Sequence, residues 1–90
     1  MATKIYHFSY DYVKVNESKM KSMLLTVDSI LDVRSSLAGT FFVKSSASAR
    51  ELSKSIIPLI PGIRFIISEI GDNRQGWLPI SVWDFIKQRP

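Results

Sequence analysis

The chain contains no cysteine, only one histidine and only four glycines among its 90 residues. Without cysteine it forms neither a disulfide framework nor a thiolate metal site, and a cysteine nucleophile is excluded. The single histidine, His7, excludes a multi-histidine metal site within one chain. There is no Gly-rich phosphate-binding loop, and no serine lies in a nucleophile-elbow motif. The sequence therefore gives no support to acyl transfer or nucleotide hydrolysis.

Long apolar segments are absent as well. The longest apolar stretches, around residues 23–25 and 56–63, are too short to span a bilayer. The first residues run directly into a strand pattern and lack the apolar core and cleavage site of a signal peptide. We therefore expect a cytoplasmic protein without a membrane partner.

The composition is that of one folded domain. Ninety residues leave no room for a second core, and 46% hydrophobic with 22% charged residues is ordinary for a globular chain. We expect a single domain over residues 1–90 that requires no cofactor to fold. Twelve lysines and arginines against eight acids give a net charge of +4, a mild excess that favours polyanionic partners.

Hydrophobic periodicity predicts the secondary structure. Branched and aromatic residues dominate four predicted strands, 4–11, 32–37, 40–44 and 63–70, of which the last is so apolar that we expect it to be central. Apolar residues at three-to-four-residue spacing predict a first helix from Asn16 to Leu31 and a second, capped by Ser48 and Glu51, that Pro58 kinks or ends. A short terminal helix is predicted from Ser81, with Asp84 completing its capping box.

This order predicts an α+β fold of ferredoxin-like βαββαβ build. One antiparallel sheet would carry two helices on one face, with a short C-terminal strand or helix as an appendage. Two short helices cannot cover both faces of such a sheet. We therefore expect a homodimer that associates through the open face or the C-terminal segment.

Several short motifs, taken in order, carry a family resemblance. They are Tyr6–Asp11, Ser36–Lys44, Ser48–Leu52, Gly76–Pro79 and Trp83–Ile86. In these the chain resembles the Cas2-like group of small ferredoxin-fold proteins, and especially its SinR-like branch. The residues Leu37–Gly39 before Thr40 depart from the tighter family pattern.

The resemblance implies a homodimer associated with nucleic acid. In the family, the acid that ends the first strand matches Asp11 here, and in some members it is assigned a metal-dependent nuclease role with Mg²⁺ or Mn²⁺. Other relatives are ribonuclease-type toxins, and others are DNA-binding scaffolds that need no catalysis.

Asp11 and His7 are the candidates for a catalytic or metal-binding role. Two symmetry-related Asp11 carboxylates in a dimer cleft would suit a hard divalent cation that activates water against a phosphodiester, so Asp11 is the candidate for both a catalytic and a metal-binding role. Alternatively, Asp11 ends its strand as an ordinary turn residue. His7 is either a hydrogen-bonded structural histidine or an acid-base group at such a cleft.

Basic and aromatic residues form the predicted nucleic-acid-binding set. The basic members are Arg34, Lys44, Arg50, Lys54, Arg64 and Arg74. Arg34, Lys44 and Arg64 would form a phosphate-binding strip if their strands were neighbours. The alternative is a solvated surface neutralised by nearby acids.

The aromatic residues allow two interpretations. Tyr6 and Tyr10 are candidates for stacking on unpaired bases, and the alternative is that they pack in the core. Trp77 is a third exposed-aromatic candidate, but we assign Trp77 and Trp83 mainly to pinning the terminal segment.

Three functions follow as hypotheses. The leading one is a homodimeric RNA-binding protein that is weakly catalytic or not catalytic. The second is a metal-dependent endonuclease that uses Asp11. The third is a small inhibitor or antitoxin of a phage or bacterial conflict system that binds a nuclease or toxin partner, with or without RNA.

Overall fold

Four strands and three α-helices follow one another along residues 3–87, the part of the chain that the computed structural model describes. The elements are β1 (Lys4–Tyr10), α1 (Glu17–Leu24), β2 (Ile30–Leu37), β3 (Thr40–Ser45), α2 (Ala49–Ile56), the short 3₁₀ helix η1 (Ile57–Leu59), β4 (Phe65–Glu69) and α3 (Ile80–Lys87).

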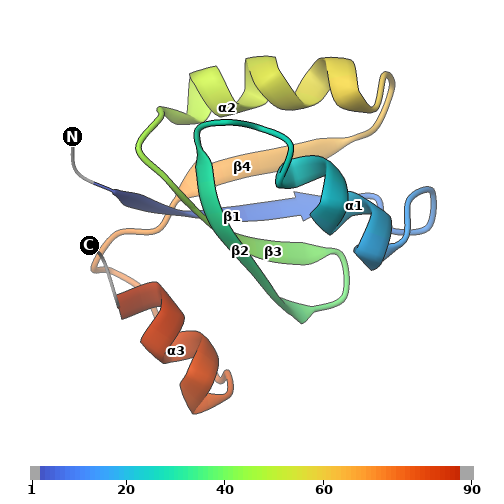
Figure 1. The fold of residues 1–90 in the computed structure, drawn as a ribbon. Helices are drawn as coiled ribbons and strands as arrows, with labels where there is room; N and C mark the ends of the chain where they lie inside the picture. Colours follow the sequence, from blue (N-terminus) through green and yellow to red (C-terminus); the bar gives the residue numbers. More distant parts are fainter. Residues whose placement is uncertain (1–2, 88–90) are drawn as a thin grey trace.

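The strands form one sheet in the order β2-β3-β1-β4, and every neighbouring pair is antiparallel (Figure 1). Within this sheet Phe8 of β1 lies opposite Phe41 of β3 on one side and opposite Ile67 of β4 on the other. The predicted α+β class and antiparallel sheet are confirmed, and the arrangement is compatible with a ferredoxin-like fold.

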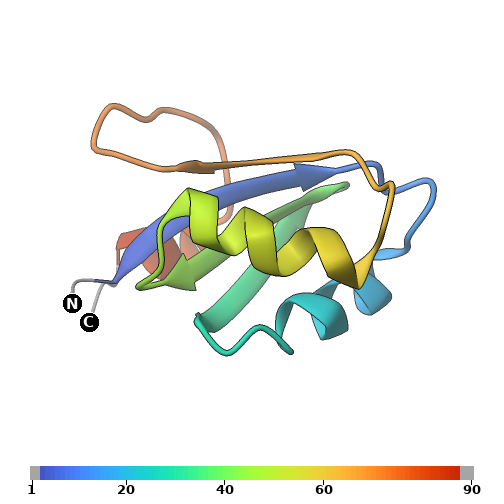
Figure 2. The ribbon, with the colours of Figure 1, turned by 90° about the horizontal axis from the view of Figure 1, so that it is seen from above.

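Alternation along β1 separates two apolar clusters. Tyr6, Phe8 and Tyr10 point to the face that α1 and α2 cover, which we call the inner face, and pack there with residues such as Met20 and Leu52. Figure 2 shows α1 and α2 on one side of the strands and the segment that follows β4 on the other. Each fully buried side chain of this size contributes about 1.5–3 kcal/mol to folding, so the inner cluster is the main core.

The opposite, outer face carries a smaller cluster. Ile5 of β1 and Phe42 of β3 point to this face and pack with Val82, Phe85 and Ile86 of α3. The terminal helix therefore covers part of the sheet face that the sequence led us to expect open for a partner.

Local capping explains where two helices begin. The Asn16 side chain accepts a hydrogen bond from the Lys19 N–H at 2.9 Å. At α2 the Ser48 hydroxyl accepts from the Glu51 N–H and the Glu51 carboxylate accepts from the Ser48 N–H, both at 3.2 Å, which confirms the predicted capping box.

The first helix is shorter than predicted. It ends at Leu24 because the chain turns there, with the Thr26 N–H bonded to Met23 and the Val27 N–H bonded to Leu24. Val27 and Ile30 are still buried in the inner cluster, but from a turn and a strand. Apolar residues therefore continue at helical spacing beyond the end of the helix.

Two further predictions were wrong. β4 is an edge strand, not a central one, and Ile66 on it is 63% exposed. The terminal helix begins at Ile80, so Ser81 lies inside it and does not cap it; the Pro79 carbonyl accepts instead from the Val82 N–H at 3.0 Å.

Candidate nucleic-acid interface

Two cations meet on one flank of α3, on the outer face. The Arg34 guanidinium carbon lies 5.4 Å from the centre of the Phe85 ring, and the Lys44 Nζ lies 4.2 Å from it. The strand register brings them together, because Arg34 lies opposite Phe42, two residues from Lys44 on β3. Asp84 lines the same hollow, so this pair of cations is partly balanced by acidic charge.

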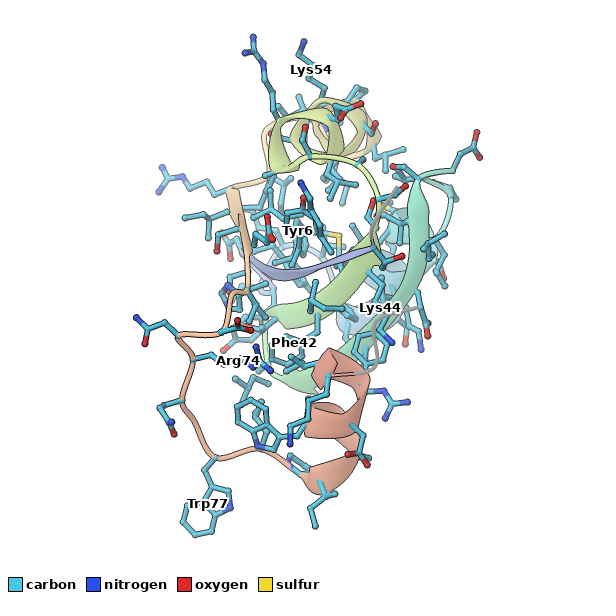
Figure 3. The ribbon with its side chains drawn as sticks, turned by 90° about the vertical axis from the view of Figure 1, so that its left-hand side faces the viewer. Tyr6, Phe42, Lys44, Lys54, Arg74 and Trp77 are labelled. Atoms are coloured by element: carbon cyan, nitrogen blue, oxygen red, sulfur yellow. The ribbon has the colours of Figure 1, made fainter. Side chains whose placement is uncertain are left out.

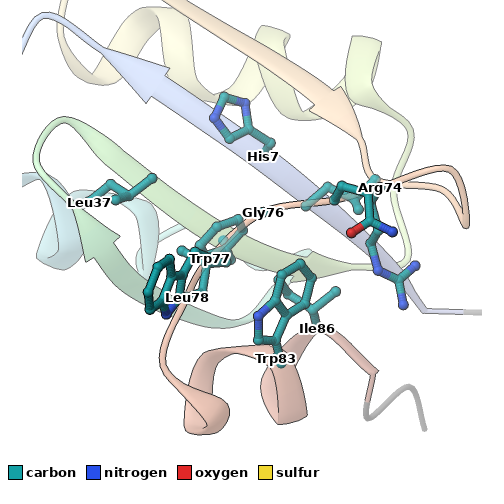
Figure 4. A pocket seen from close by; sticks show the side chains of 11 residues that line it. His7, Leu37, Arg74, Gly76, Trp77, Leu78, Trp83 and Ile86 are labelled. Atoms are coloured by element: carbon teal, nitrogen blue, oxygen red, sulfur yellow. The ribbon is translucent and has the colours of Figure 1, made fainter.

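A pocket of about 300 Å³ lies on the other flank of α3 (Figure 4). We call it the α3 pocket. Its lining residues come from the outer face of the sheet, from the segment after β4 and from α3: His7, Leu37, Phe42, Ile70, Arg74, Gln75, Gly76, Trp77, Leu78, Trp83 and Ile86. Most of its wall is apolar or aromatic, and the groups able to form strong hydrogen bonds are few.

His7 is fixed within this wall by neighbouring polar groups. Its Nε2 lies 3.0 Å from the Ser9 hydroxyl, which lies 3.2 Å from the Thr40 hydroxyl. The His7 and Phe42 rings are tilted by 56° with their centres 6.3 Å apart. This agrees with a hydrogen-bonded structural histidine, and it also places the ring edge at the pocket.

The segment after β4 contributes residues 74–78 to the wall of the pocket. The Arg74 Nη1 donates a hydrogen bond to the Gly71 carbonyl at 2.8 Å and lies 3.7 Å from an Asp72 carboxylate oxygen. Trp77 is 98% exposed, and Figure 3 shows it projecting away from the sheet. The prediction that Trp77 pins the terminal segment is therefore wrong, whereas Trp83 packs against the outer cluster as predicted.

The predicted phosphate-binding strip is only partly assembled. Arg34 and Lys44 adjoin, but Arg64 immediately precedes β4 at the opposite edge of the sheet. Arg50 and Lys54 are exposed on α2, and Figure 3 shows Lys54 on the far side of the molecule from Trp77. The six predicted cations therefore belong to more than one surface.

The tyrosines proposed for stacking lie in the core. Tyr6 is 1% and Tyr10 is 7% exposed, so neither ring offers a face to a base. The Tyr6 hydroxyl donates to the Ala47 carbonyl at 2.7 Å. Burial raises the pKa of both phenols above the ordinary value. Packing, the alternative interpretation, is correct for both residues.

Asp11 lies in a turn at the end of β1. Its N–H donates to the Arg64 carbonyl at 3.1 Å, and its backbone carbonyl accepts from the Lys14 N–H at 3.2 Å. Among residues 3–87 no three His, Asp or Glu side chains cluster closely enough to hold a metal ion. The catalytic and metal-binding roles of Asp11 stay predictions.

Sequence reasoning missed the α3 pocket. Gln75 and Leu78 were not selected as site residues. His7 was not connected with Trp83, because the two residues are 76 positions apart in the sequence. The one signal in the sequence was the aromatic density of residues 77–85.

Within the described part of the chain no helix is long and apolar enough to cross a membrane. Comparison of the chain with protein-family models, with curated proteins and with solved structures finds no match. The resemblance to the Cas2-like group therefore stays a prediction.

Proposed function

We propose that the chain binds single-stranded RNA on the outer face of its sheet, with one unpaired base in the α3 pocket. The observation that supports this most directly is the aromatic pocket, whose lining residues include the exposed Trp77 and the cationic Arg74. An unpaired base has an apolar face that an aromatic wall accepts and polar edges that a few hydrogen-bonding groups read.

The shape of the site favours a single strand over a duplex. The pocket is recessed between α3 and the sheet, so that a base has to leave its stack in order to enter it. Stacking of one base on an aromatic side chain contributes about 1–3 kcal/mol. Trp77 lines the pocket but is 98% exposed, so it offers a second stacking surface for the neighbouring base.

The cations beside α3 supply the phosphate contacts. Arg74 lines the pocket on one flank of α3, and Arg34 and Lys44 lie on the opposite flank of the same helix. If all three neutralise phosphates, the log–log salt dependence of binding has a slope of about −2, because each contact on a single strand contributes about −0.7. Asp32 and Asp84 beside Arg34 and Lys44, and Asp72 beside Arg74, weaken this attraction, so binding is expected to be modest and salt-sensitive.

Intrinsic fluorescence provides a direct test, because the only two tryptophans of the chain both line the pocket. Titration with single-stranded RNA at low ionic strength is expected to quench this fluorescence and to raise the polarisation of a labelled oligonucleotide. Trp77→Ala and Arg74→Ala weaken binding, whereas Lys54→Ala, on the far side of the molecule, is the matched control and changes little. Absence of salt-sensitive binding at low ionic strength would remove the proposal.

The other predicted functions gain no specific support. An Asp11-dependent endonuclease would require Mg²⁺ or Mn²⁺ and would lose cleavage in Asp11→Asn, and an inhibitor or antitoxin would retain a protein partner after nuclease treatment. No contact among the described residues favours either over RNA binding. The homodimer remains part of the proposal, since two copies present two such faces to one strand.

A further inference from the structure

One edge of the sheet offers backbone groups that no described strand occupies. Among residues 3–87, β4 pairs only with β1. The Arg64 carbonyl accepts from the Asp11 N–H, and the Ile70 N–H donates to the Ile5 carbonyl. Even-numbered residues of this segment therefore bond toward β1, and the odd-numbered ones within 65–69 direct their N–H and C=O groups outward. Figure 1 shows β4 at the edge of the sheet, between β1 and α2.

Apart from its short length and the charged Glu69 at its end, this edge lacks the features that usually prevent strand pairing. Proteins protect exposed edges with lysine, proline, bulges or a covering segment. β4 has the sequence Phe-Ile-Ile-Ser-Glu, and its pairing with β1 has no register shift. Ile66 on the strand and Ile57 beside it are 63% and 52% exposed. By contrast, the pairing of the other edge strand, β2, is interrupted by two register shifts.

We propose that a second copy of the chain occupies this edge, with the two β4 strands antiparallel and Ile66 on the two-fold axis. An antiparallel pair in one continuous sheet has its axis perpendicular to the sheet, so that residues opposite each other point to the same face. Residues on one face of a strand differ by an even number, so the residue numbers of two opposite residues must have an even sum. This restricts the possible registers. With Ile66 on the axis, Ile66 lies opposite the partner's Ile66, and Phe65 lies opposite the partner's Ile67.

The neighbouring register is less complementary. With Ile67 on the axis, Phe65 would lie opposite the partner's Glu69, and Ile66 would lie opposite the partner's Ser68. Apart from Ile67 on the axis, apolar side chains of β4 would then meet polar ones on both faces. The Ile66 register instead matches Phe65, Ile66 and Ile67 with apolar residues, sets Arg64 against the partner's Ser68, and leaves only Ile63 opposite the partner's Glu69. Cross-strand pairs of this kind each contribute about 0.2–1 kcal/mol.

The contact has a consequence for the proposed RNA site but does not depend on it. Because the axis is perpendicular to the sheet, the outer faces of both copies lie on the same side of an eight-stranded sheet. Two α3 pockets would then face one RNA strand, and the second contact becomes intramolecular. The expected dimer differs from the one inferred from the sequence, which used the open face or the C-terminal segment.

Cysteine cross-linking tests the register, since the chain has no cysteine of its own. Ile66 and the partner's Ile66 would form a non-hydrogen-bonded pair with Cα atoms about 4.5 Å apart, which a disulfide can bridge. Ile66→Cys is therefore expected to give a covalent dimer under mild oxidation without RNA. Leu31→Cys, 56% exposed on β2, is the matched control and is expected to stay mainly monomeric on a denaturing gel. Equal cross-linking of the two variants would overturn the proposal, and faster cross-linking of Ile67→Cys would overturn the register.

Sedimentation velocity of the unmodified chain, again without RNA, tests the dimer itself. The chain is expected to sediment as a dimer, Ile66→Lys as a folded monomer, and Leu31→Lys as a dimer with the same circular dichroism. A monomeric unmodified chain, or a dimer that persists in Ile66→Lys, would contradict the interface. A chain that dimerises but binds no RNA would instead refute only the proposed function, so the two failures are distinguishable.

Discussion

The ammonium group of Lys44 lies 4.2 Å from the centre of the Phe85 ring, so that a strand and the terminal helix meet through a cation and an aromatic face. Arg34 approaches the same ring at 5.4 Å. Two like charges are thus held close together, and the negative face of the ring offsets part of their repulsion. The same contact that attaches α3 to the sheet also fixes the position of two proposed phosphate contacts.

A double-mutant cycle measures this attachment. Phe85→Leu keeps an apolar side chain in the outer cluster but removes the aromatic face, and Lys44→Met keeps the length of the side chain without its charge. We expect a coupling free energy of about 0.5–1 kcal/mol between the two changes in urea denaturation. Additive effects would show that the ring and the ammonium group do not interact in solution.

A second pair of variants compares two buried phenols on the same strand. The Tyr6 hydroxyl donates to the Ala47 carbonyl, whereas the Tyr10 hydroxyl is buried with no hydrogen-bond partner among the described residues. Tyr6→Phe is therefore expected to lower the free energy of unfolding by about 1 kcal/mol, and Tyr10→Phe to leave it unchanged or raise it slightly. Chemical denaturation of both variants checks this, and a larger loss in Tyr10→Phe would contradict the hydrogen-bonding pattern.

The cap of α2 predicts a pH dependence. Hydrogen bonds from Ser48, first its backbone N–H and then its hydroxyl, lower the pKa of the Glu51 carboxyl. The folded chain therefore favours the carboxylate, and this stabilisation is present above the ordinary carboxyl pKa and lost as the pH falls through the lowered value. We expect the acid-side decline in unfolding free energy to become shallower in Glu51→Gln.

Urea titrations at several pH values on the acid side check this expectation. Asp28→Asn, at an exposed residue with no described hydrogen bond or ion pair, is the control for removing one acid. Ser48→Ala removes a helix cap and is expected to lower stability by about 1 kcal/mol near neutral pH. An unchanged acid-side slope in Glu51→Gln would show that the capping carboxylate is not coupled to folding.

Local patterns were enough to predict the parts of the fold that depend on neighbouring residues. The alternation of Tyr6, Phe8 and Tyr10 assigned one face of β1 correctly, because a strand has a period of two. The Ser48–Glu51 spacing located the start of α2. The end of α1 was missed because Val27 and Ile30 keep a helical spacing although a turn and a strand carry them.

Strand order is not local, and most of the site depends on it. The apolar run that became β4 fits a central or an edge position equally well, and only pairing with β1 decides between them. For this reason the meeting of Arg34 with Lys44 could be anticipated, but the separation of Arg64 from them could not. The exposures of Trp77 and Trp83 likewise depend on how α3 packs against Phe42.

Two glycines separate the effect of backbone conformation from that of close packing. Gly39 and Gly62 both have positive φ, 74° and 84°. An added Cβ at Gly39 would lie 2.6 Å from the Tyr12 Cδ1 and 3.2 Å from the Tyr10 carbonyl oxygen, whereas at Gly62 it would meet nothing within 4 Å. Alanine at either position has to adopt the left-handed conformation, which costs about 1–2 kcal/mol, but only alanine at Gly39 also has to displace a ring.

Urea denaturation is therefore expected to show a larger loss for Gly39→Ala than for Gly62→Ala, by about 1 kcal/mol or more. Adding Tyr12→Ala to Gly39→Ala is expected to recover part of the difference, because it removes the ring but leaves the contact with the Tyr10 carbonyl. Equal losses at the two glycines would mean that the Tyr12 ring does not pack over the β2–β3 turn in solution. A larger loss without any recovery would assign the cost to the backbone contact alone.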